Sequence, residues 1–378
     1  MVEVIEVNDI DELSHYRLLW NSLFAATPGA TFFLTFDWLE TCWRHFGSDQ
    51  KLRVLIVFAA GEPLGILPLC VRTEKYRLST VRVLTYPLDN WSTWYGPIGP
   101  NPAATMLAAT QHIRRTPRDW DMIELRWVAD DATQGGKTAR AFRVAGMLSE
   151  KKQYQSTSIV DLPARWDEFV AGKSQSIRRQ FRRTLRDVVD SGAAEYVRHR
   201  PAPASEGDGD PRWDLYEMCE AVAQASWQSE VTHGNTLTHE RVRGYFRDAH
   251  AAAARLGMAD VNLLLVEGRP AAFLYGHHCR GNVTALRTGF DASISGLGSA
   301  LMLKTIEDSC RRGDRAVDFG PGEREHKRRL RTRIESTYRL TYTPLDSWRS
   351  QAVRWTRWAK NHWLANRTLD AKPQPVSA

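Results

Sequence analysis

Two stretches of the chain carry one pattern: "VNLLLVEGRPAAFLYGHHC" at residues 261–279 and "LRVLIVFAAGEPLGILPLCV" at residues 52–71. In each stretch, two apolar runs rich in β-formers flank a short Gly-x-Pro segment. Such runs on either side of a turn-forming segment predict a strand, a tight turn and a second strand. Because this hairpin occurs in both halves of the chain, we expect an internally duplicated α/β unit.

The segments around the two hairpins follow the same order. Apolar residues at three- and four-residue spacing predict two helices before each hairpin, and a strand, a helix and a further strand follow it. In the first half these elements are predicted at 11–26, 36–46, 80–87, 102–115 and 121–128. In the second half they are predicted at 212–228, 238–256, 282–290, 296–312 and 316–320, and a strand at 336–345 closes the unit.

The predicted fold class is α/β (α+β), with two similar domains that each hold a mixed central sheet flanked by helices. We place the domains at 1–157 and 158–345, followed by a basic, Trp-rich helix and flexible tail at 346–378. The second domain begins with a helix that turns Phe169, Ile177 and Phe181 inward and a row of arginines outward.

The bulk composition fits a globular protein with an anionic partner. The chain has 378 residues, 43% hydrophobic and 25% charged, and a net charge of +7, which suits a phosphorylated cofactor, a nucleic acid or an anionic membrane. Five scattered cysteines without a C-x-x-C pair predict reduced, mostly buried thiols. The acidic first residues lack the features of a secretory signal, and no apolar run approaches the ~18–20 residues of a membrane span. We therefore expect a cytoplasmic protein.

The stretch "DASISGLGSALMLKTIEDSC" at 291–310 places Gly296 and Gly298 where a helix is predicted to begin, directly after the third strand. The first amides of a helix lack intrahelical acceptors and attract anions, and glycines there allow close approach. We expect Ser295 to be the N-cap. The spacing fits a plain helix cap equally well, because Leu301 replaces the third glycine of a dinucleotide fingerprint and no Gly-Lys-Ser/Thr follows.

At this point the chain resembles a known family. "GFDASISGLGSALMLKTIEDSCRRGDRAVDFGPGEREHKRRL" (289–330) and "SIRRQFRRTLRDVVDSG" (176–192) resemble the CelD/BcsL acetyltransferases, which are associated with cellulose biosynthesis and have the GNAT fold. The chain is also similar to the Fem-type tandem-GNAT transferases, whose Asp-Phe-Gly, spacer, Phe-Lys pattern matches 318–327 with His326 in place of the aromatic residue. Where GNAT proteins often carry Gln or Arg ahead of the glycines, this chain has Ser293.

The resemblance implies an acyltransferase that uses acetyl-CoA or another acyl-CoA and no metal. It implies that the coenzyme pyrophosphate lies on the start of the helix, at Ser295, Gly296, Leu297, Gly298, Ser299 and Ala300. Acyl transfer needs a base, a proton source and donors for the oxyanion. The candidates for these roles follow the fifth strand of the second half and are Asp318, Glu323, Glu325, His326 and Lys327. The alternative is that this charged segment is a solvated loop.

An acceptor is expected in the groove between the halves. The aromatic segment 86–100 lies where related proteins bind acceptors, which makes Asp89, Trp91 and Tyr95 candidates, together with Arg287. The first half offers "PNPAATMLAAT" in place of a Gly-rich helix start, so we expect it to shape the acceptor site rather than bind a second coenzyme. The acceptor is a saccharide, a cell-envelope precursor or another small molecule with an amine or hydroxyl.

Three other patterns have competing interpretations. His277 and His278 point to opposite sides of a strand, which argues against a shared metal ion. The Arg-rich helix suits a docked surface helix better than a nucleic-acid stripe. The tail at 347–367 mixes tryptophans with basic residues, which suits either peripheral contact with an anionic membrane or packing against the domains.

Two rival functions remain open on the sequence. One is an aminoacyl-tRNA-dependent transferase of the Fem type, which the Arg-rich helix favours. We expect a nucleic-acid partner only under this alternative. The other is a non-catalytic module that keeps the fold within a polysaccharide-synthesis complex.

Overall fold

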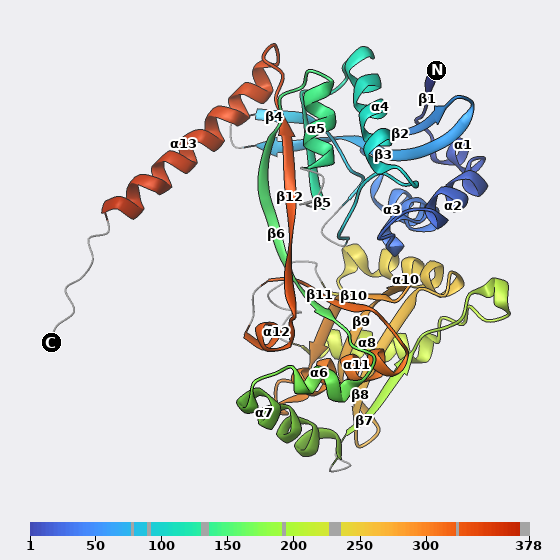
Figure 1. Ribbon diagram of the computed structural model, residues 1–378, viewed down its shortest axis with the longest axis vertical. Coiled ribbons are helices and arrows are strands. Elements are labelled where there is room, and N and C mark those ends of the chain that lie inside the picture. The colour runs from blue at the N-terminus through green and yellow to red at the C-terminus, as the bar shows by residue number, and fades with distance from the viewer. Residues whose placement is uncertain are drawn as a thin grey trace.

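A computed structural model describes residues 1–76, 79–88, 92–129, 136–190, 194–226, 236–322 and 325–370. Within these ranges the chain forms two lobes that share one sheet of mixed strands (Figure 1). The strands are β1 Val2–Val7, β2 Gln50–Ala59, β3 Glu62–Tyr76, β4 Ser79–Thr85, β5 Met122–Ala129, β6 Glu150–Asp161, β7 Ala194–His199, β8 Ala259–Val266, β9 Arg269–Cys279, β10 Asn282–Phe290, β11 Ala316–Pro321 and β12 Arg333–Tyr342.

The helices of the first lobe precede its hairpin or lie between its later strands. They are α1 Ile10–Ser14, α2 Arg17–Ala25, α3 Phe36–Phe46, α4 Pro102–Arg115 and α5 Lys137–Val144, with a 3₁₀ turn at Phe32–Leu34. The helices that follow β6 are α6 Trp166–Ala171, α7 Gln175–Leu185, α8 Trp213–Ala225, α10 Glu240–Arg255, α11 Leu297–Arg311, α12 Glu325–Leu330 and α13 Trp348–Asp370, with a π-helical turn at Arg186–Asp190 and a 3₁₀ turn at Ala204–Glu206. Both predicted hairpins are confirmed as β2–β3 and β8–β9.

The strand order confirms the internal repeat. It reads β1-β2-β3-β4-β5-β12-β6-β11-β10-β9-β8-β7, so the first five strands and the strands β7 to β11 repeat one arrangement on opposite sides of a central pair. In each repeat the fourth and fifth strands are parallel, β4 with β5 and β10 with β11, while the other neighbours are antiparallel. A helix joins each parallel pair, α4 in the first lobe and α11 in the second.

The central pair is exchanged between the lobes. The strand β6 follows the first lobe but pairs with β11, and β12 ends the second lobe but pairs with β5. The two strands also pair with each other over most of their length, and Figure 1 shows them running from one lobe to the other. The strand predicted at 336–345 therefore does not close the second unit alone. The predicted division after residue 157 falls inside β6.

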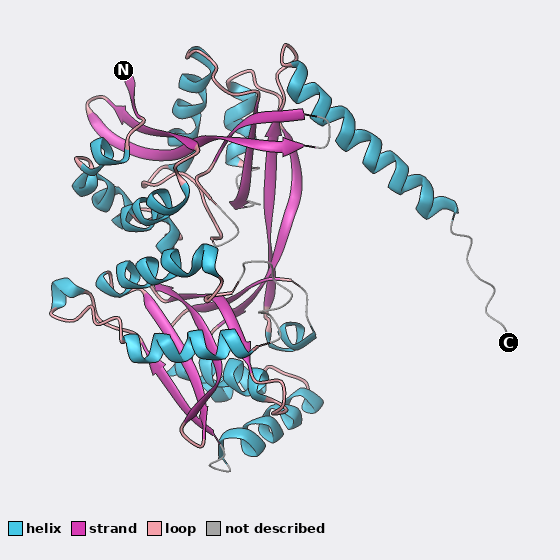
Figure 2. Ribbon diagram, turned by 180° about the vertical axis from the view of Figure 1, so that it is seen from behind, coloured by secondary structure: helices cyan, strands magenta, loops and turns pink. Residues whose placement is uncertain are grey.

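The second lobe has three layers because β9 alternates its side chains between two helical faces. Ala272 and Leu274 pack into a cluster with α11, α6 and α7. Phe273, Tyr275 and the next residue on that face, His277, point the other way, towards α8, α10 and the first lobe. Figure 2 shows these helices on both sides of the strands.

The two lobes are packed together through α3 and α10, which lie against each other. The buried Trp38 of α3 donates its Nε1–H to the Tyr245 hydroxyl of α10 at 2.9 Å. Arg255 of α10 lies 3.4 Å from Asp37 of α3. All five cysteines are buried and free. Among the described residues, none of the helices combines the length and apolarity that crossing a membrane requires.

Candidate active site

An opening between β10 and β11 lies at the centre of the candidate site. These parallel strands pair over Asn282↔Ala316, Val283↔Val317 and Thr284↔Asp318, and no further pair follows within the described strands. The register of β10 against β9 shifts between Ala285 and Arg287, which marks a β-bulge just beyond the last pair. Beyond this point the described parts of β10 and β11 are not paired with each other, and we refer to this break in the ladder as the gap.

The helix α11 begins at the mouth of this gap. Gly296 is its N-cap, in the left-handed conformation with φ 88°, and no side chain caps the helix. The expected cap, Ser295, is therefore wrong: it lies one residue before the cap and is exposed. Ala300 N donates to Gly296 O at 2.9 Å, so the amides of Leu297, Gly298 and Ser299 precede the first helical hydrogen bond.

The corresponding helix of the first lobe starts differently. Asn101 caps α4 with its side chain, whose Oδ1 accepts from Ala104 N at 3.2 Å. Pro102 follows the cap and has no amide hydrogen. The first turn of α4 therefore has one amide capped by a side chain and one missing, whereas no side chain caps the first turn of α11. This difference fits the prediction that the second half alone binds a coenzyme.

Packing explains one of the two glycines. A Cβ atom at Gly298 would lie 3.0 Å from the ring of Phe290 on β10, so glycine lets the start of α11 lie against that ring. At Gly296 the backbone conformation, rather than space, requires glycine, because the nearest neighbour of a Cβ would be Val188 at 3.4 Å. Ser293, ahead of both, donates its amide and hydroxyl to Asp291 Oδ1 at 2.9 and 2.7 Å.

Two basic helices surround the start of α11. A small cavity of about 30 Å³ is lined by Ser299 of α11, by Phe181 of α7 and by His326 and Arg329 of α12, among others. Arg329 Nη1 donates to Gln180 Oε1 at 2.7 Å and joins α12 to α7. Exposed arginines cover the outer side of α7 and its π-helical extension, namely Arg179, Arg182, Arg183 and Arg186. The cationic surroundings and the helix dipole together favour an anion at this point.

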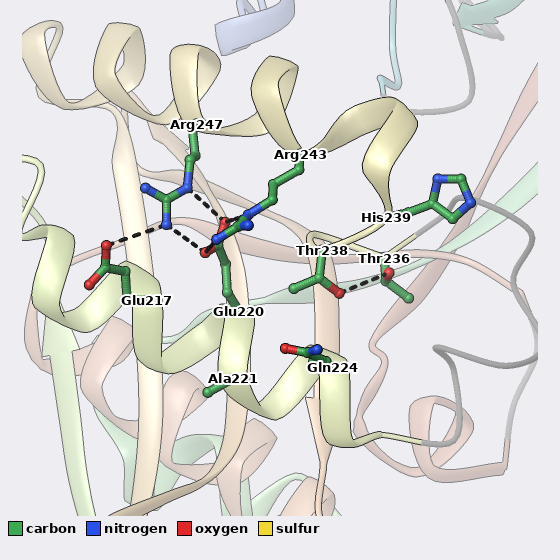
Figure 3. Close-up of a pocket in the computed structure, with 9 residues that line it drawn as sticks. All are labelled: Glu217, Glu220, Ala221, Gln224, Thr236, Thr238, His239, Arg243 and Arg247. Atoms are coloured by element: carbon green, nitrogen blue, oxygen red, sulfur yellow. Dashed lines mark hydrogen bonds and ion pairs between the residues drawn. The ribbon is translucent and has the colours of Figure 1, made fainter.

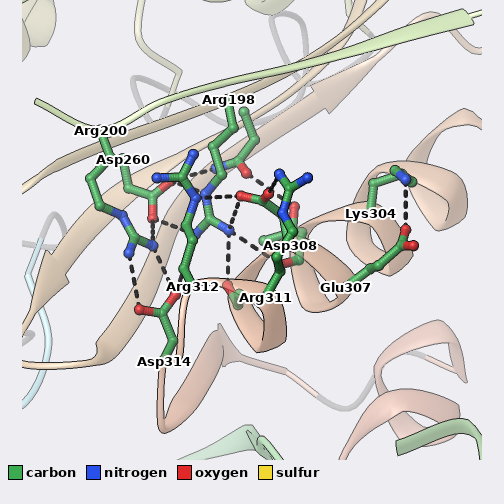
Figure 4. Close-up of polar contacts among 12 residues, drawn as sticks. Arg198, Arg200, Asp260, Lys304, Glu307, Asp308, Arg311, Arg312 and Asp314 are labelled. Atoms are coloured by element: carbon green, nitrogen blue, oxygen red, sulfur yellow. Dashed lines mark hydrogen bonds and ion pairs between the residues drawn. The ribbon is translucent and has the colours of Figure 1, made fainter. Parts of the chain in front are cut away.

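A buried ion network holds the other end of α11 to the sheet (Figure 4). Arg198 of β7 donates to Asp260 of β8 at 2.6 and 2.9 Å and to Asp308 of α11 at 3.2 Å. Arg200 joins Asp260 to Asp314. Burial raises the pKa of Asp260, but its two arginines outweigh this and lower it to about 2. The network thus stays charged and fixes the helix that presents the amides.

Asp318 lies on β11 at the apex of the gap and contacts the first lobe. It is 8% exposed, on the face opposite α11, because its neighbours Val317 and Phe319 pack into the α11 cluster. Trp94 of the first lobe donates its Nε1–H to Asp318 Oδ2 at 2.7 Å, and Gly320 N donates to Oδ1 at 2.7 Å. Burial raises the pKa of Asp318, and these hydrogen bonds oppose that shift only in part.

The structure separates the other predicted catalytic residues. Lys327 donates its Nζ–H to Pro321 O at 2.9 Å and Gly320 O at 3.3 Å, so its ammonium lies at the end of β11 and next to Asp318. His326 faces the small cavity beside Ser299 instead. Glu325 pairs with Arg328 and Arg329 along α12. Glu323 lies outside the described residues. The alternative of a solvated loop does not hold for residues 325–330, which form the short helix α12.

The predicted acceptor residues lie in different environments. Arg287 is on the same sheet face as Asp318, over the Phe246 ring of α10 at 5.3 Å, and burial lowers its pKa to about 10. Tyr95 is buried within the first lobe beside Trp38, with ring centroids 5.7 Å apart. Asp89 and Trp91 lie outside the described residues. Within the described part of this segment, Trp94 contacts the second lobe. The sequence analysis did not select Trp94, because nothing in the sequence indicates its backbone conformation, which has a positive φ of 53°.

A polar groove lies between α8 and α10 (Figure 3). Its volume is about 510 Å³, and its walls carry Glu217 and Glu220 from α8 and Arg243 and Arg247 from α10. Both arginines donate to Glu220, at distances from 2.6 to 3.2 Å. The sequence analysis did not predict this groove. Its charged residues come from two helices, and the sequence of each helix alone shows nothing beyond an ordinary amphipathic pattern.

The two adjacent histidines lie in different environments. His277 is buried and stacks on Phe32 with ring centroids 4.3 Å apart, while His278 Nε2 lies 3.2 Å from Asp314 Oδ1. Burial lowers the pKa of His277 to about 3. Among the residues that the structure describes, no group of His, Cys, Asp and Glu has the arrangement of a metal site.

Comparison with known proteins shows what the region around this site is similar to. Residues 175–328 match the family model described as the acetyltransferase (GNAT) domain, which spans α7, the gap, α11 and most of α12. No curated protein matches the sequence. The matched part of the second lobe is thus similar to a GNAT domain, and the repeat of its arrangement in the first lobe confirms the predicted fold class of two GNAT-like units. The CelD/BcsL assignment remains a prediction.

Three solved structures share the fold of the whole chain. The crystal structure of FemX matches with a TM-score of 0.60 and 11% identity, over 90% of this chain and 97% of that one. The C-terminal domain (DUF2156) of a putative lysylphosphatidylglycerol synthetase from Agrobacterium fabrum gives 0.54 and 11%, over 92% and 96%. The L-PGS structure from Bacillus licheniformis gives 0.52 and 12%, over 90% and 96%. These similarities show a shared two-lobed fold.

Proposed function

We propose that this protein transfers an acyl group from acetyl-CoA or a related acyl-CoA to an amine or hydroxyl. The single observation that carries this proposal is the start of α11, where amides without helical acceptors meet a gap in a GNAT-type sheet and two basic helices. A pyrophosphate on Leu297, Gly298 and Ser299 would leave the thioester end directed into the gap. The acyl-CoA supplies an activated carbonyl carbon.

The residues at the apex of the gap suit the proton and charge changes of this reaction. Asp318 has a raised pKa and lies beside the opening, so it is placed to accept the proton that an attacking amine or hydroxyl must lose. Lys327 lies at the end of the same strand and would stabilise negative charge that develops near the acyl carbonyl. Trp94 holds Asp318 from the first lobe and orients its carboxylate.

The acceptor site is proposed on the sheet face that carries α8 and α10. Arg287 lies over Phe246 of α10 on this face, and the groove between α8 and α10 offers two arginines and two glutamates within about 510 Å³. This volume is in the usual range for a small ligand. Guanidinium groups bind carboxylates and phosphates, and carboxylates bind amines and hydroxyls. A charged saccharide or cell-envelope precursor has both kinds of group.

A second donor is favoured by one observation. The exposed arginines of α7 extend the basic surface beyond what a pyrophosphate needs, and they suit the phosphates of an aminoacyl-tRNA. The fold shared with FemX agrees with the resemblance to Fem-type transferases that suggested this donor. The five free, buried cysteines support a reducing, cytoplasmic location for either reaction.

Calorimetry with acetyl-CoA, longer acyl-CoAs and free coenzyme A tests the donor, and release of the coenzyme thiol tests transfer to a panel of amino sugars and muropeptides. Micromolar binding of an acyl-CoA with acceptor-dependent thiol release is the expected result. Binding without transfer to any acceptor would favour a non-catalytic module. No binding of any acyl-CoA, with transfer from a charged tRNA, would replace the proposal by the second donor.

A further inference from the structure

The exposed tryptophans of α13 form a stripe that points away from the protein. Trp348, Trp355 and Trp358 are 69%, 66% and 57% exposed, and Leu345 just before the helix is 85% exposed. Spacings of seven and three residues place the three tryptophans on one side of a helix. A soluble surface seldom exposes several large aromatic groups together, so this stripe indicates an interaction surface.

The opposite side of α13 fixes the helix to the first lobe. Val353 is buried among Val81, Val83 and Met122 of β4 and β5. Four residues later, Arg357 donates to the buried Glu124 at 2.7 Å. These contacts involve the first half of α13, and Figures 1 and 2 show the rest of the helix projecting away from both lobes. The tryptophan stripe is therefore held outward by packing on its other side.

The charge of this segment selects the kind of partner. Between Asp346 and Asp370 the sequence contains Arg349, Arg354, Arg357, Lys360 and Arg367 and no acidic residue. Of these, Arg354 is exposed, and Arg349 lies over the Trp348 ring at 5.5 Å and 3.8 Å from Asp121. Tryptophans prefer the headgroup region of a bilayer, and flanking cations are attracted to anionic lipids.

We propose that α13 binds the surface of an anionic membrane, with Trp348, Trp355 and Trp358 in the headgroup region and the flanking arginines on lipid phosphates. The helix lies on the membrane rather than across it, in agreement with its low apolarity. At about 1.5 Å per residue, 23 residues give an arm of about 35 Å that holds the lobes beside the bilayer. This proposal does not depend on the acyl-transfer reaction.

Flotation of the full chain with lipid vesicles tests the proposal. We expect binding to phosphatidylcholine vesicles that contain phosphatidylglycerol, weak binding to pure phosphatidylcholine and a loss of binding at high salt. The double variant W355A/W358A should bind at least about tenfold more weakly, because most of the buried apolar area is removed. The variant R354Q, which removes an exposed charge, should bind about fivefold more weakly to the anionic vesicles alone.

The matched control is Leu18→Ala, which removes an 84% exposed apolar side chain from α2, far from α13 in the sequence. Its vesicle binding and its melting temperature should equal those of the wild type, and W355A/W358A should melt at the same temperature. Equal flotation of the wild type and W355A/W358A would overturn the proposal. Absence of binding to anionic vesicles would also overturn it. If, in that case, light scattering showed a dimer that W355A/W358A abolishes, the stripe would be an interface between two copies of the chain instead.

Discussion

The substitution Ser299→Glu separates the stability of α11 from its proposed use as an anion site. Ser299 is exposed at the third position of the helix, after the N-cap Gly296. A glutamate there reaches back towards the N-cap amide and interacts favourably with the helix dipole. The same carboxylate would occupy the position proposed for the coenzyme pyrophosphate. The variant should therefore be as stable as the wild type and bind acyl-CoA worse.

The expected gain in stability is small. A carboxylate in the first turn contributes about 0.3–1 kcal/mol at an exposed site. His326 and Arg329 line the cavity next to Ser299 and would add attraction. Since about 1 kcal/mol raises the melting temperature of a large domain by ~2–4 °C, we expect an increase of up to about 4 °C. A fall in melting temperature is not expected.

The expected loss of affinity is much larger. Two unit charges about 6 Å apart repel by ~0.7 kcal/mol at the dielectric constant of water and by ~1.4 kcal/mol at half that value. The pyrophosphate carries two negative charges, so the penalty is about 1.4–2.8 kcal/mol, or roughly 10- to 100-fold in the dissociation constant. The penalty should shrink at high ionic strength, since the site is exposed.

Calorimetry with acetyl-CoA measures the dissociation constant, and a thermal melt of the same preparation measures the melting temperature. Ser299→Gln introduces a side chain as long as glutamate but without its charge. It should lose less than about threefold in affinity for acetyl-CoA, because the Coulomb penalty is absent. Ala104→Glu places a carboxylate at the same position of α4, which Asn101 caps, and should leave acyl-CoA binding unchanged. If Ser299→Glu binds acetyl-CoA within about twofold of the wild type, the start of α11 is not the pyrophosphate site.

Three further predictions concern the apex of the gap and the ion network. Trp94→Phe keeps an aromatic ring but removes the hydrogen-bond donor to Asp318. In urea unfolding, a double-mutant cycle with Asp318→Asn should give a coupling free energy of about 1–3 kcal/mol. A coupling free energy near zero would show that the two side chains do not stabilise each other. Lys327→Ala should lower turnover about tenfold or more and leave the affinity for acyl-CoA nearly unchanged. Arg328→Ala, on the same helix, is the control. Unchanged turnover of Lys327→Ala would show that Lys327 takes no part in the reaction. The pKa of Asp260, lowered to about 2 by its arginines, should supply about 2 kcal/mol of stability that is present above about pH 4 and lost as the pH falls towards 2. Unfolding of Asp260→Asn should therefore depend less on pH in this range, and an unchanged acid limb would contradict the assignment.

Much of the fold follows from local patterns in the sequence. The hairpins β2–β3 and β8–β9 and the helices α4 and α11 were predicted to within a few residues, because their apolar residues follow strand or helix periodicity. The strands β1, β6 and β7 were not predicted. The sequence of β6, EKKQYQSTSIVD, is polar through most of its length, since the strand crosses between the lobes where little of it is buried. Its identity as a strand depends on pairing with β11 and β12, which are distant in the sequence.

The candidate site was predicted in part for the same reason. Asp318, Lys327 and the start of α11 could be selected because they follow strands of a recognisable unit. Trp94 could not, because the contact with Asp318 joins residues far apart in the chain. The proximity of α7 and α12 to Ser299 also arises from tertiary packing, and α12 is too short and too charged to be predicted as a helix.

The exchange of β6 and β12 explains how one lobe can serve a site in the other. The helix of the first lobe that corresponds to α11 lacks such an open start, since Asn101 caps α4 with its side chain and Pro102 has no amide hydrogen. It contributes Trp94, whose contact with Asp318 is useful only if the two lobes keep a fixed distance. Because β6 pairs with β11 and β12 pairs with β5, a continuous ladder of backbone hydrogen bonds joins the lobes through the sheet. Such a ladder is stiffer than a linker, and a fixed geometry between donor and acceptor groups is what acyl transfer between two bound molecules requires.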